Sequence, residues 1–138
     1  MSETRKIKAT FEGGYKVSYE LEGKKVLTTD VATPENPSSY PSPVDTLCMA
    51  LTACTSAHIS MTLAKFGIEL KEMNVETNAV VVEDPDKRIT DINMMFNFKQ
   101  EFPERERAAL ERSIKQCLIG HSLNPDIKKN VVYNYGVK

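Results

Sequence analysis

The sequence predicts a single α+β domain over residues 1–138, with the element order βββ-α-ββ-α-β. Three observations lead to this prediction. Residues 7–21 and 89–98 alternate between apolar and polar side chains, which is typical of half-buried strands. Residues 42–67 carry apolar side chains at helical spacing, and a second helical pattern follows Pro103. We therefore expect two helices packed on antiparallel sheet.

The first segment predicts a meander of three strands. Apolar side chains at Tyr15, Val17 and Tyr19 alternate with polar ones, and Gly23 lies in a tight turn before a third short strand. One face of this meander should contribute to a core. Residues 30–43 contain four prolines, so they predict an extended loop, which is either a linker or the rim of a pocket at the start of the next helix.

The central helix is predicted from Ser42 as N-cap, through Pro43 at the first helical position, to an ending at Gly67. One face of this helix combines apolar, thiol and imidazole side chains, at Leu47, Leu51, Cys54, His58 and Met61. The opposite face is also apolar in the first half, so protein should surround the helix on most sides. Its Asp, Thr, Ser and His residues make it too polar for a membrane span.

The remaining elements follow in order. Residues 74–82 and 89–98 predict two strands joined by a turn, with the inward positions Ile92, Met94, Phe96 and Phe98. The second helix opens at Pro103 and ends at Gly120, and its predicted apolar stripe is Leu110, Ile114, Cys117 and Leu118. A last strand is predicted around residues 131–135.

Composition excludes several classes of function. Charges nearly cancel, with 18 Lys and Arg against 19 Asp and Glu, so neither nucleic acid nor an anionic membrane surface is an expected partner. The first residues lack an apolar signal-peptide core, which predicts a cytosolic protein. In a reducing compartment its three cysteines should be reactive, metal-binding or simply buried rather than a disulfide framework.

Cys54 and Cys117 are the candidate reactive residues, because each is predicted on the buried stripe of a helix. A reactive cysteine needs a group that lowers its pKa, and His58, one helical turn after Cys54, could act in this way. A second cysteine within reach could resolve a sulfenic acid into a disulfide. The alternative is that both thiols only pack in the core, as buried cysteines commonly do.

Two further interpretations stay open, a zinc site and a charge pair at Asp45. Cys54 and His58 repeat the spacing of Cys117 and His121, and two such pairs could close a tetrahedral zinc site, although Gly120 should end the helix before His121. Cys48 lies off the face of Cys54 and is expected to pack. Asp45 could form half of a charge pair or complement the helix dipole.

Three motifs in this order resemble the OsmC/Ohr family of osmotically inducible and organic hydroperoxide resistance proteins. SPVDTLCMALTACTSAHISMTLAKFGIEL is similar to the cysteine-bearing helix of that family, and DPDKRITDINMMFNF is similar to its central strand. IKQCLIGHSLNPDI is similar to the segment that carries its second cysteine. The order and spacing of the motifs, with a cysteine in the first and the third, make the resemblance specific.

The resemblance implies an intertwined homodimer with active sites at its interface. It implies that Cys54 attacks an organic hydroperoxide as thiolate, and that Cys117 then forms a disulfide with it. An external dithiol, often of lipoyl type, would reduce this disulfide, and no metal or other cofactor is needed. Asp45 is then a candidate electrostatic partner and His58 a candidate tuner of Cys54.

The chain also departs from the family pattern. Peroxidases of this family hold the thiolate with an upstream arginine paired to a glutamate, but here no arginine lies between Arg5 and Arg88. Lys24 or Lys25 could supply the charge without the bidentate fork of arginine. Leu118 replaces the proline that follows the second cysteine. The alternative function is therefore a non-catalytic dimer that binds a small apolar ligand in its interface cleft.

Overall fold

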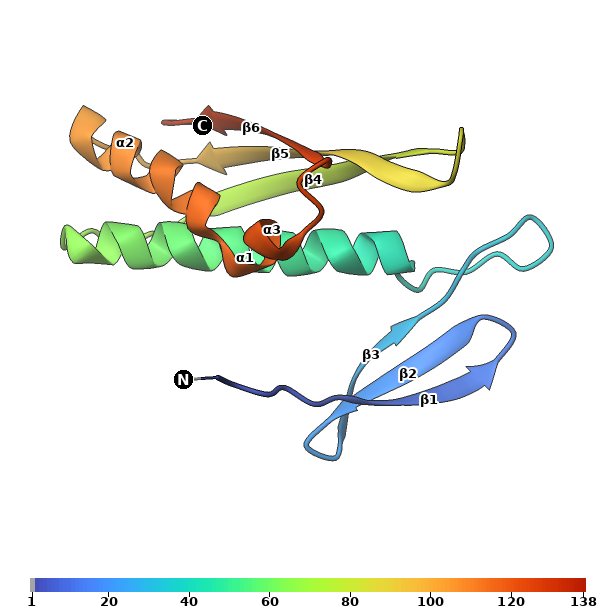
Figure 1. Ribbon diagram of the computed structural model, residues 1–138. Coiled ribbons are helices and arrows are strands. Elements are labelled where there is room, and N and C mark those ends of the chain that lie inside the picture. Colours follow the sequence, from blue (N-terminus) through green and yellow to red (C-terminus); the bar gives the residue numbers. More distant parts are fainter. Residues whose placement is uncertain (1) are drawn as a thin grey trace. The chain divides into compact units, whose positions relative to one another are not determined.

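The computed structural model describes residues 2–138, which divide into two compact units, one up to Leu47 and one over Cys48–Lys138. Figure 1 shows the elements in chain order. The predicted α+β class and the order βββ-α-ββ-α-β are confirmed, with a 3-10 turn and a short helix added after the second helix. The long helix α1 (Pro43–Lys65) contains the boundary between the units, and each unit is described by itself.

The first unit contains the predicted meander. β1 (Lys8–Gly13), β2 (Lys16–Leu21) and β3 (Lys24–Thr29) pair antiparallel in that order. The prediction that this meander offers a buried apolar face is wrong for the single chain, because Phe11 and Tyr15 of the alternating set are 68% and 58% exposed. Its buried residues are polar: Ser18, Thr29 and Asp30. A sheet buries a face only against another layer, and this unit contains one sheet and only the first residues of α1.

Both predicted ends of α1 are confirmed. The hydroxyl of Ser42 accepts a hydrogen bond from the backbone N–H of Asp45 at 3.1 Å, and the Asp45 carboxylate accepts one from the N–H of Ser42 at 2.9 Å. This reciprocal pair satisfies two N–H groups at the helix start. At the other end Gly67 has a φ of 74°, and the N–H of Ile68 donates to the carbonyl of Leu63. Such an ending needs a left-handed residue, which glycine adopts without strain.

The buried face of α1 differs from the predicted stripe. It consists of residues four apart, namely Leu51, Thr55, Ile59 and Leu63. Met61, which was predicted on the buried stripe, is 54% exposed, and Met49 is 51% exposed. The prediction that protein surrounds the helix is therefore wrong for the single chain. Periodicity could not choose between its faces, because almost every face carries apolar side chains.

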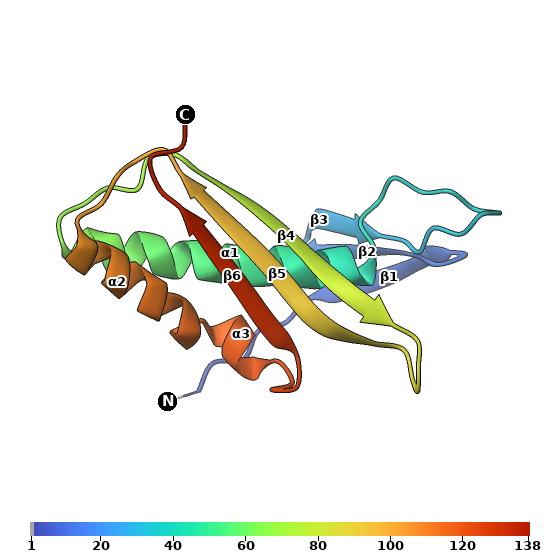
Figure 2. The same ribbon diagram turned by 90° about the horizontal axis from the view of Figure 1, so that it is seen from above.

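The second unit is built on a three-stranded sheet in the order β4-β5-β6, shown from above in Figure 2. β4 (Met73–Val82) and β5 (Arg88–Phe98) form the predicted antiparallel hairpin. β6 (Lys128–Asn134) runs parallel to β5, so the expectation of a wholly antiparallel sheet is wrong. The helical segment between β5 and β6 provides the long crossover that a parallel neighbour requires.

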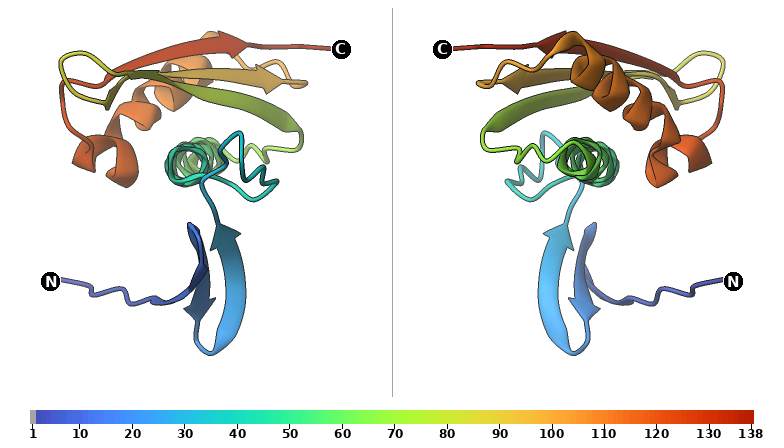
Figure 3. Two further views of the ribbon diagram at one scale, coloured as in Figure 1. Left: turned by 90° about the vertical axis from the view of Figure 1, so that its right-hand side faces the viewer. Right: turned by 90° about the vertical axis from the view of Figure 1, so that its left-hand side faces the viewer.

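The two faces of this sheet have opposite character. The predicted inward side chains of β5, from Ile92 to Phe98 at every second position, are all buried. On the other face, the side-chain amide of Asn93 donates to Asn78 and accepts from Asn130, each at 2.8 Å. Figure 3 views the sheet end-on and shows that α1 and the later helices lie on one side of it. The core of the unit therefore lies between the apolar face and these helices.

The second helical segment is broken where the sequence predicted one continuous helix. α2 (Glu104–Ser113) is followed by the 3-10 turn η1 (Ile114–Gln116) and by the short helix α3 (Leu118–Ser122). The predicted ending at Gly120 is wrong, because Gly120 lies inside α3 and is buried. The predicted stripe also fails at Leu118, which is 68% exposed. An extended residue, Cys117, separates the turn from α3.

By length and hydropathy alone, α1 would pass as a membrane-spanning helix, and it is the one such helix among residues 2–138. The core helix of a soluble protein meets the same criterion. Here Leu51, Ile59 and Leu63 of α1 are buried in the protein's own core. One such helix is by itself weak evidence for a membrane span.

Candidate functional site

Cys54 lies near the middle of α1, beside the buried face of that helix. It is half-buried and packs against the core cluster of the second unit. Its neighbour Thr55 is buried, and the Thr55 hydroxyl donates to the carbonyl of Leu51 at 3.0 Å. In the middle of a helix the backbone N–H groups are already bonded to carbonyls four residues back, so α1 has none to offer the sulfur of Cys54.

Cys117 occupies the extended position between η1 and α3, with φ −60° and ψ 126°. Its side chain is 1% exposed and caps α3, because the sulfur accepts a hydrogen bond from the N–H of Gly120 at 3.5 Å. The first N–H groups of α3 have no carbonyl partner within that helix. They are therefore available to a group lying next to Cys117.

The structure brings the two predicted cysteines together. Both are reduced, and the thiol of Cys117 donates a hydrogen bond to the sulfur of Cys54. Burial alone would raise the pKa of Cys54. The hydrogen bonds from Cys117 and from the backbone N–H groups of Ile119 and Leu118 outweigh burial, so the pKa of Cys54 lies below the ordinary thiol value.

The pKa of Cys117 shifts in the opposite direction. Burial raises it, and donation of its proton to Cys54 raises it further, against a lowering hydrogen bond from the N–H of Gly120. Cys54 therefore loses its proton first, and Cys117 stays protonated beside it. This asymmetry is the arrangement that a nucleophilic thiolate and a second thiol require.

Asp45 and His58, the other two predicted site residues, take no part in the hydrogen bonds of the thiol pair. Asp45 is exposed, belongs to the other unit and uses its carboxylate in the helix cap, so an electrostatic role towards Cys54 stays a prediction. His58 is half-buried one turn after Cys54, and its ring makes no hydrogen bond or ion pair within residues 2–138. Its proposed tuning of Cys54 also stays a prediction.

No metal cluster is formed by the described part of the chain, residues 2–138. Nowhere in it do three His, Cys, Asp or Glu side chains converge. His121 lies in the last turn of α3 and is exposed, whereas Cys117 in the same predicted pair is buried. Because helix α3 begins after Cys117, this pair does not lie on one helix as Cys54 and His58 do. The zinc alternative therefore has no side-chain set in this structure.

The sequence did not reveal the donor role of Leu118 and Ile119. Their N–H groups act through the backbone, so the identity of the side chains gives no signal. The pattern of the similar family did contain a signal, because that family has proline at the position of Leu118. Proline favours the first position of a helix, so the family pattern indicates that a new helix begins at this position.

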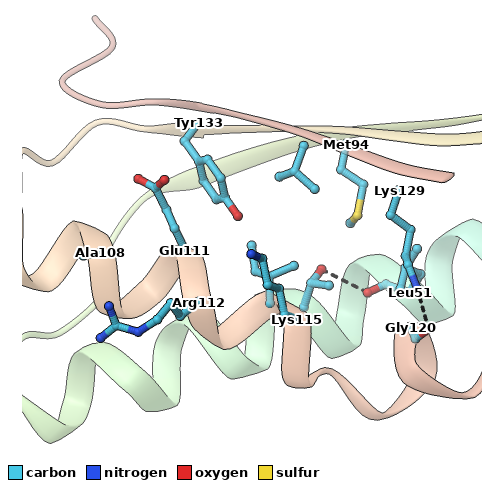
Figure 4. Close-up of a pocket in the computed structure, with 12 residues that line it drawn as sticks. Leu51, Met94, Ala108, Glu111, Arg112, Lys115, Gly120, Lys129 and Tyr133 are labelled. Atoms are coloured by element: carbon cyan, nitrogen blue, oxygen red, sulfur yellow. Dashed lines mark hydrogen bonds between the residues drawn. The ribbon is translucent and has the colours of Figure 1, made fainter.

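A cavity of about 720 Å³ lies in the second unit between α1, the α2–α3 segment and the sheet. Figure 4 shows its lining. Leu51 and Thr55 line it from α1, and Gly120 lines it from α3. Cys54 and Cys117 do not line it, so the cavity and the thiol pair are neighbouring but separate features.

Fold and site together define an α+β protein in which a thiol on a central helix is paired with a second thiol from a later helical segment. A sequence model of the OsmC-like protein family matches residues 36–131. This chain belongs to that family. The match includes both cysteines, and the resemblance inferred from the three motifs is confirmed.

Solved structures show the same fold over almost the whole chain. An osmotic stress induced and detoxification response protein from Psychrobacter arcticus is 21% identical, with a TM-score of 0.84, and the match covers 96% of this chain and 98% of that one. An OsmC-like protein from Mycoplasma pneumoniae is 16% identical, with a TM-score of 0.84 and coverage of 98% and 99%. The organic hydroperoxide resistance protein OhrB of Bacillus subtilis is 16% identical, with a TM-score of 0.72 and coverage of 95% and 98%. No curated protein sequence matches the chain significantly.

Proposed function

We propose that this chain is a cytosolic thiol-dependent peroxidase that reduces organic hydroperoxides to alcohols, with Cys54 as the attacking residue and Cys117 as the resolving residue. The observation that carries the proposal is the reduced pair itself. Cys117 donates to Cys54, and the pKa of Cys54 falls while that of Cys117 rises. Membership of the OsmC-like family and the organic hydroperoxide resistance proteins among its structural neighbours support the choice of substrate.

The proposed reaction has two steps at sulfur. The Cys54 thiolate attacks the terminal peroxide oxygen, the O–O bond breaks, and the alkoxide leaves as an alcohol after taking up a proton. Cys54 is then a sulfenic acid, and Cys117 attacks its sulfur to form a disulfide with release of water. An external dithiol reduces this disulfide by two thiol exchanges and is itself oxidised to a disulfide.

Neutral donors take the place of a cation in this proposal. The family's arginine has no counterpart between Arg5 and Arg88. The lowered pKa of Cys54 has hydrogen bonds from Cys117 and from the N–H groups of Leu118 and Ile119 among its causes, and no charged side chain. Hydrogen bonds to the charged form of an acid lower its pKa in the same direction as a nearby cation does. A thiolate can therefore form at Cys54 without the arginine.

The homodimer implied by the family belongs to the same proposal. Apolar side chains that are exposed in the single chain lie on α1 at Met49 and Met61 and on the meander at Phe11 and Val26. Large exposed apolar side chains, present on each of the two units, are typical of a protein–protein interface. Light scattering on the purified protein should give twice the mass of the 15.5 kDa chain, and a monomer would contradict this part of the proposal.

Peptide mass spectrometry under non-reducing conditions tests the thiol chemistry directly. Reduced protein treated with a slight excess of cumene hydroperoxide should form the Cys54–Cys117 disulfide rapidly and stoichiometrically. The disulfide should be absent in Cys54→Ser and unchanged in Cys48→Ser, which serves as the matched cysteine control. Thiols that survive the peroxide intact would reject the proposal.

The second candidate function is a non-catalytic dimer that binds a small apolar ligand in its interface cleft. The missing arginine favours it, since that residue holds the thiolate in peroxidases of this family. In this case Cys54 and Cys117 would only pack, and Cys54 would not react with alkylating agents. Intact thiols after peroxide treatment, together with ligand retained on the purified dimer, would favour this function.

A further inference from the structure

We propose that the cavity between α1, the α2–α3 segment and β6 is a binding site for a monocarboxylate with an apolar body, such as a medium-chain fatty acid. The cavity belongs wholly to the second unit and is not lined by either cysteine of the pair. Its volume of about 720 Å³ lies within the usual range for small-molecule sites. The proposal does not depend on the thiol chemistry.

The walls of the cavity are mainly apolar. Leu51 of α1 and Met94 of β5 form the deeper part, and both are buried. Ile114 of η1 and Val131 of β6 close it from two further elements. An alkyl chain or an aromatic ring would lose water contact on several sides here, which is the main source of affinity for an apolar ligand.

Two polar side chains of the lining, the half-buried Tyr133 and the exposed Lys115, have no hydrogen-bond partner within residues 2–138. Figure 4 shows the hydroxyl of Tyr133 and the side chain of Lys115 turned towards the same region. Within residues 2–138 neither the Tyr133 hydroxyl nor the Lys115 ammonium makes a hydrogen bond or ion pair. Both groups can donate. Burial, and after it the negative charge of Glu111, raises the pKa of Tyr133 to about 12, so its hydroxyl keeps its proton at neutral pH.

The other charged side chains around the cavity either make hydrogen bonds within the protein or are turned away from Tyr133. The ammonium of Lys129 donates to the carbonyl of Gly120 at 2.7 Å. The carboxylate of Glu111 accepts from the hydroxyl of Tyr135 at 2.7 Å. The guanidinium of Arg112 is turned away from Tyr133 (Figure 4). Lys115, which is exposed, is therefore the cation of the lining that can receive the head of an anionic ligand.

One ammonium and one phenol suit a ligand with a single, compact negative head. A carboxylate can accept from both donors at once, and hydrogen bonds to a charged group are the stronger kind. The apolar walls favour a body without further polar groups, because such groups would lose water without gaining partners. A monocarboxylic acid with an alkyl or aryl body meets both requirements.

Isothermal titration calorimetry of the full-length reduced protein with decanoate tests the proposal. We expect binding that is about tenfold weaker in Lys115→Gln and about fivefold weaker in Tyr133→Phe. The ring of Tyr133 stacks on that of Phe96, with 5.8 Å between the ring centroids. Tyr133→Phe keeps this ring and removes only the hydroxyl. The matched control is Lys128→Gln, which removes a lysine from β6, the strand of Tyr133, but outside the cavity lining. This variant should bind decanoate with the affinity of the parent protein.

Neutral and cationic analogues separate head-group recognition from simple apolar burial. The proposal expects 1-decanol and decylamine to bind at least about tenfold more weakly than decanoate. Equal affinity for decanoate and 1-decanol, equal affinity in Lys115→Gln and the parent protein, or no binding of decanoate would each overturn it. Repeating the titration in Cys54→Ser keeps this test separate from the proposed peroxidase, because that variant lacks the peroxide chemistry but retains the cavity.

Discussion

Cys54 and Cys117 are chemically identical side chains, yet the two regions around them differ in what the backbone can offer. Cys54 lies within a regular helix of 23 residues, where every nearby N–H is already bonded. Cys117 lies at a break between two helical segments, where the N–H groups of Leu118 and Ile119 are unpaired within α3. These N–H groups donate to the sulfur of Cys54. The acidity of the first thiol is therefore set by the segment that carries the second.

The largest expected effect is the loss of Cys54 itself. Cys54→Ser should lower the rate of cumene hydroperoxide consumption, with a dithiol as reductant, on the order of 10³-fold or more, because serine is not ionised and is a poor nucleophile. Stopped-flow or coupled turnover assays measure this rate. Cys48→Ser should keep the parent rate. A Cys54→Ser protein that still consumes peroxide would show that another thiol carries the reaction.

Replacement of Cys117 separates its two roles. Cys117→Ser and Cys117→Ala should both abolish the disulfide and lower steady-state turnover by about 100-fold or more, because no second thiol resolves the sulfenic acid. The hydroxyl of serine can still donate to Cys54, whereas alanine cannot. Ultraviolet absorbance of the thiolate should therefore show a higher pKa for Cys54 in Cys117→Ala than in Cys117→Ser. Equal values would mean that the Cys117 thiol does not contribute to the acidity of Cys54.

Much of the fold could be predicted from the sequence because its signals are local. The cap at Ser42, the ending at Gly67 and the alternation from Ile92 to Phe98 each follow from backbone chemistry or period. The predictions that proved wrong are those in which one sequence pattern was compatible with two structures. The apolar stripe of α1 could face several ways, and the pattern from Leu110 to Leu118 continued across a break in the helix.

The candidate site was predictable only in part. The pairing of Cys54 with Cys117 followed from the family resemblance, since the two residues lie 63 positions apart and periodicity cannot relate them. The donor groups at Leu118 and Ile119 could not be predicted, because they belong to the backbone and depend on where α3 begins. The cavity was also missed, as Lys115 and Tyr133 come together only through the crossover from α2 to β6.

The order in which the thiols are alkylated provides a pH-dependent test. The pKa of Cys54 is lowered and that of Cys117 is raised, so between the two values Cys54 is a thiolate while Cys117 is a thiol. Iodoacetamide at neutral pH should therefore modify Cys54 at least about tenfold faster than Cys117, which is also buried. The difference should narrow as the pH rises and Cys117 ionises. Peptide mass spectrometry on quenched samples measures both rates, and faster alkylation of Cys117 would reverse the assignment of roles.

The smallest expected effect comes from removing one backbone donor at Leu118. Proline has no N–H, so Leu118→Pro should raise the pKa of Cys54 and slow its alkylation at neutral pH by about threefold. The fold should tolerate this change, because Leu118 is the first residue of α3 and Cys117 before it is extended, with ψ 126°. Leu118→Ala shortens the same exposed side chain but keeps the N–H, and it should alkylate as the parent protein does. Equal alkylation rates in the proline and alanine variants would show that the N–H of Leu118 does not lower the pKa of Cys54. The hydrogen bonds from Cys117 and from the N–H of Ile119 would then stabilise the thiolate without it.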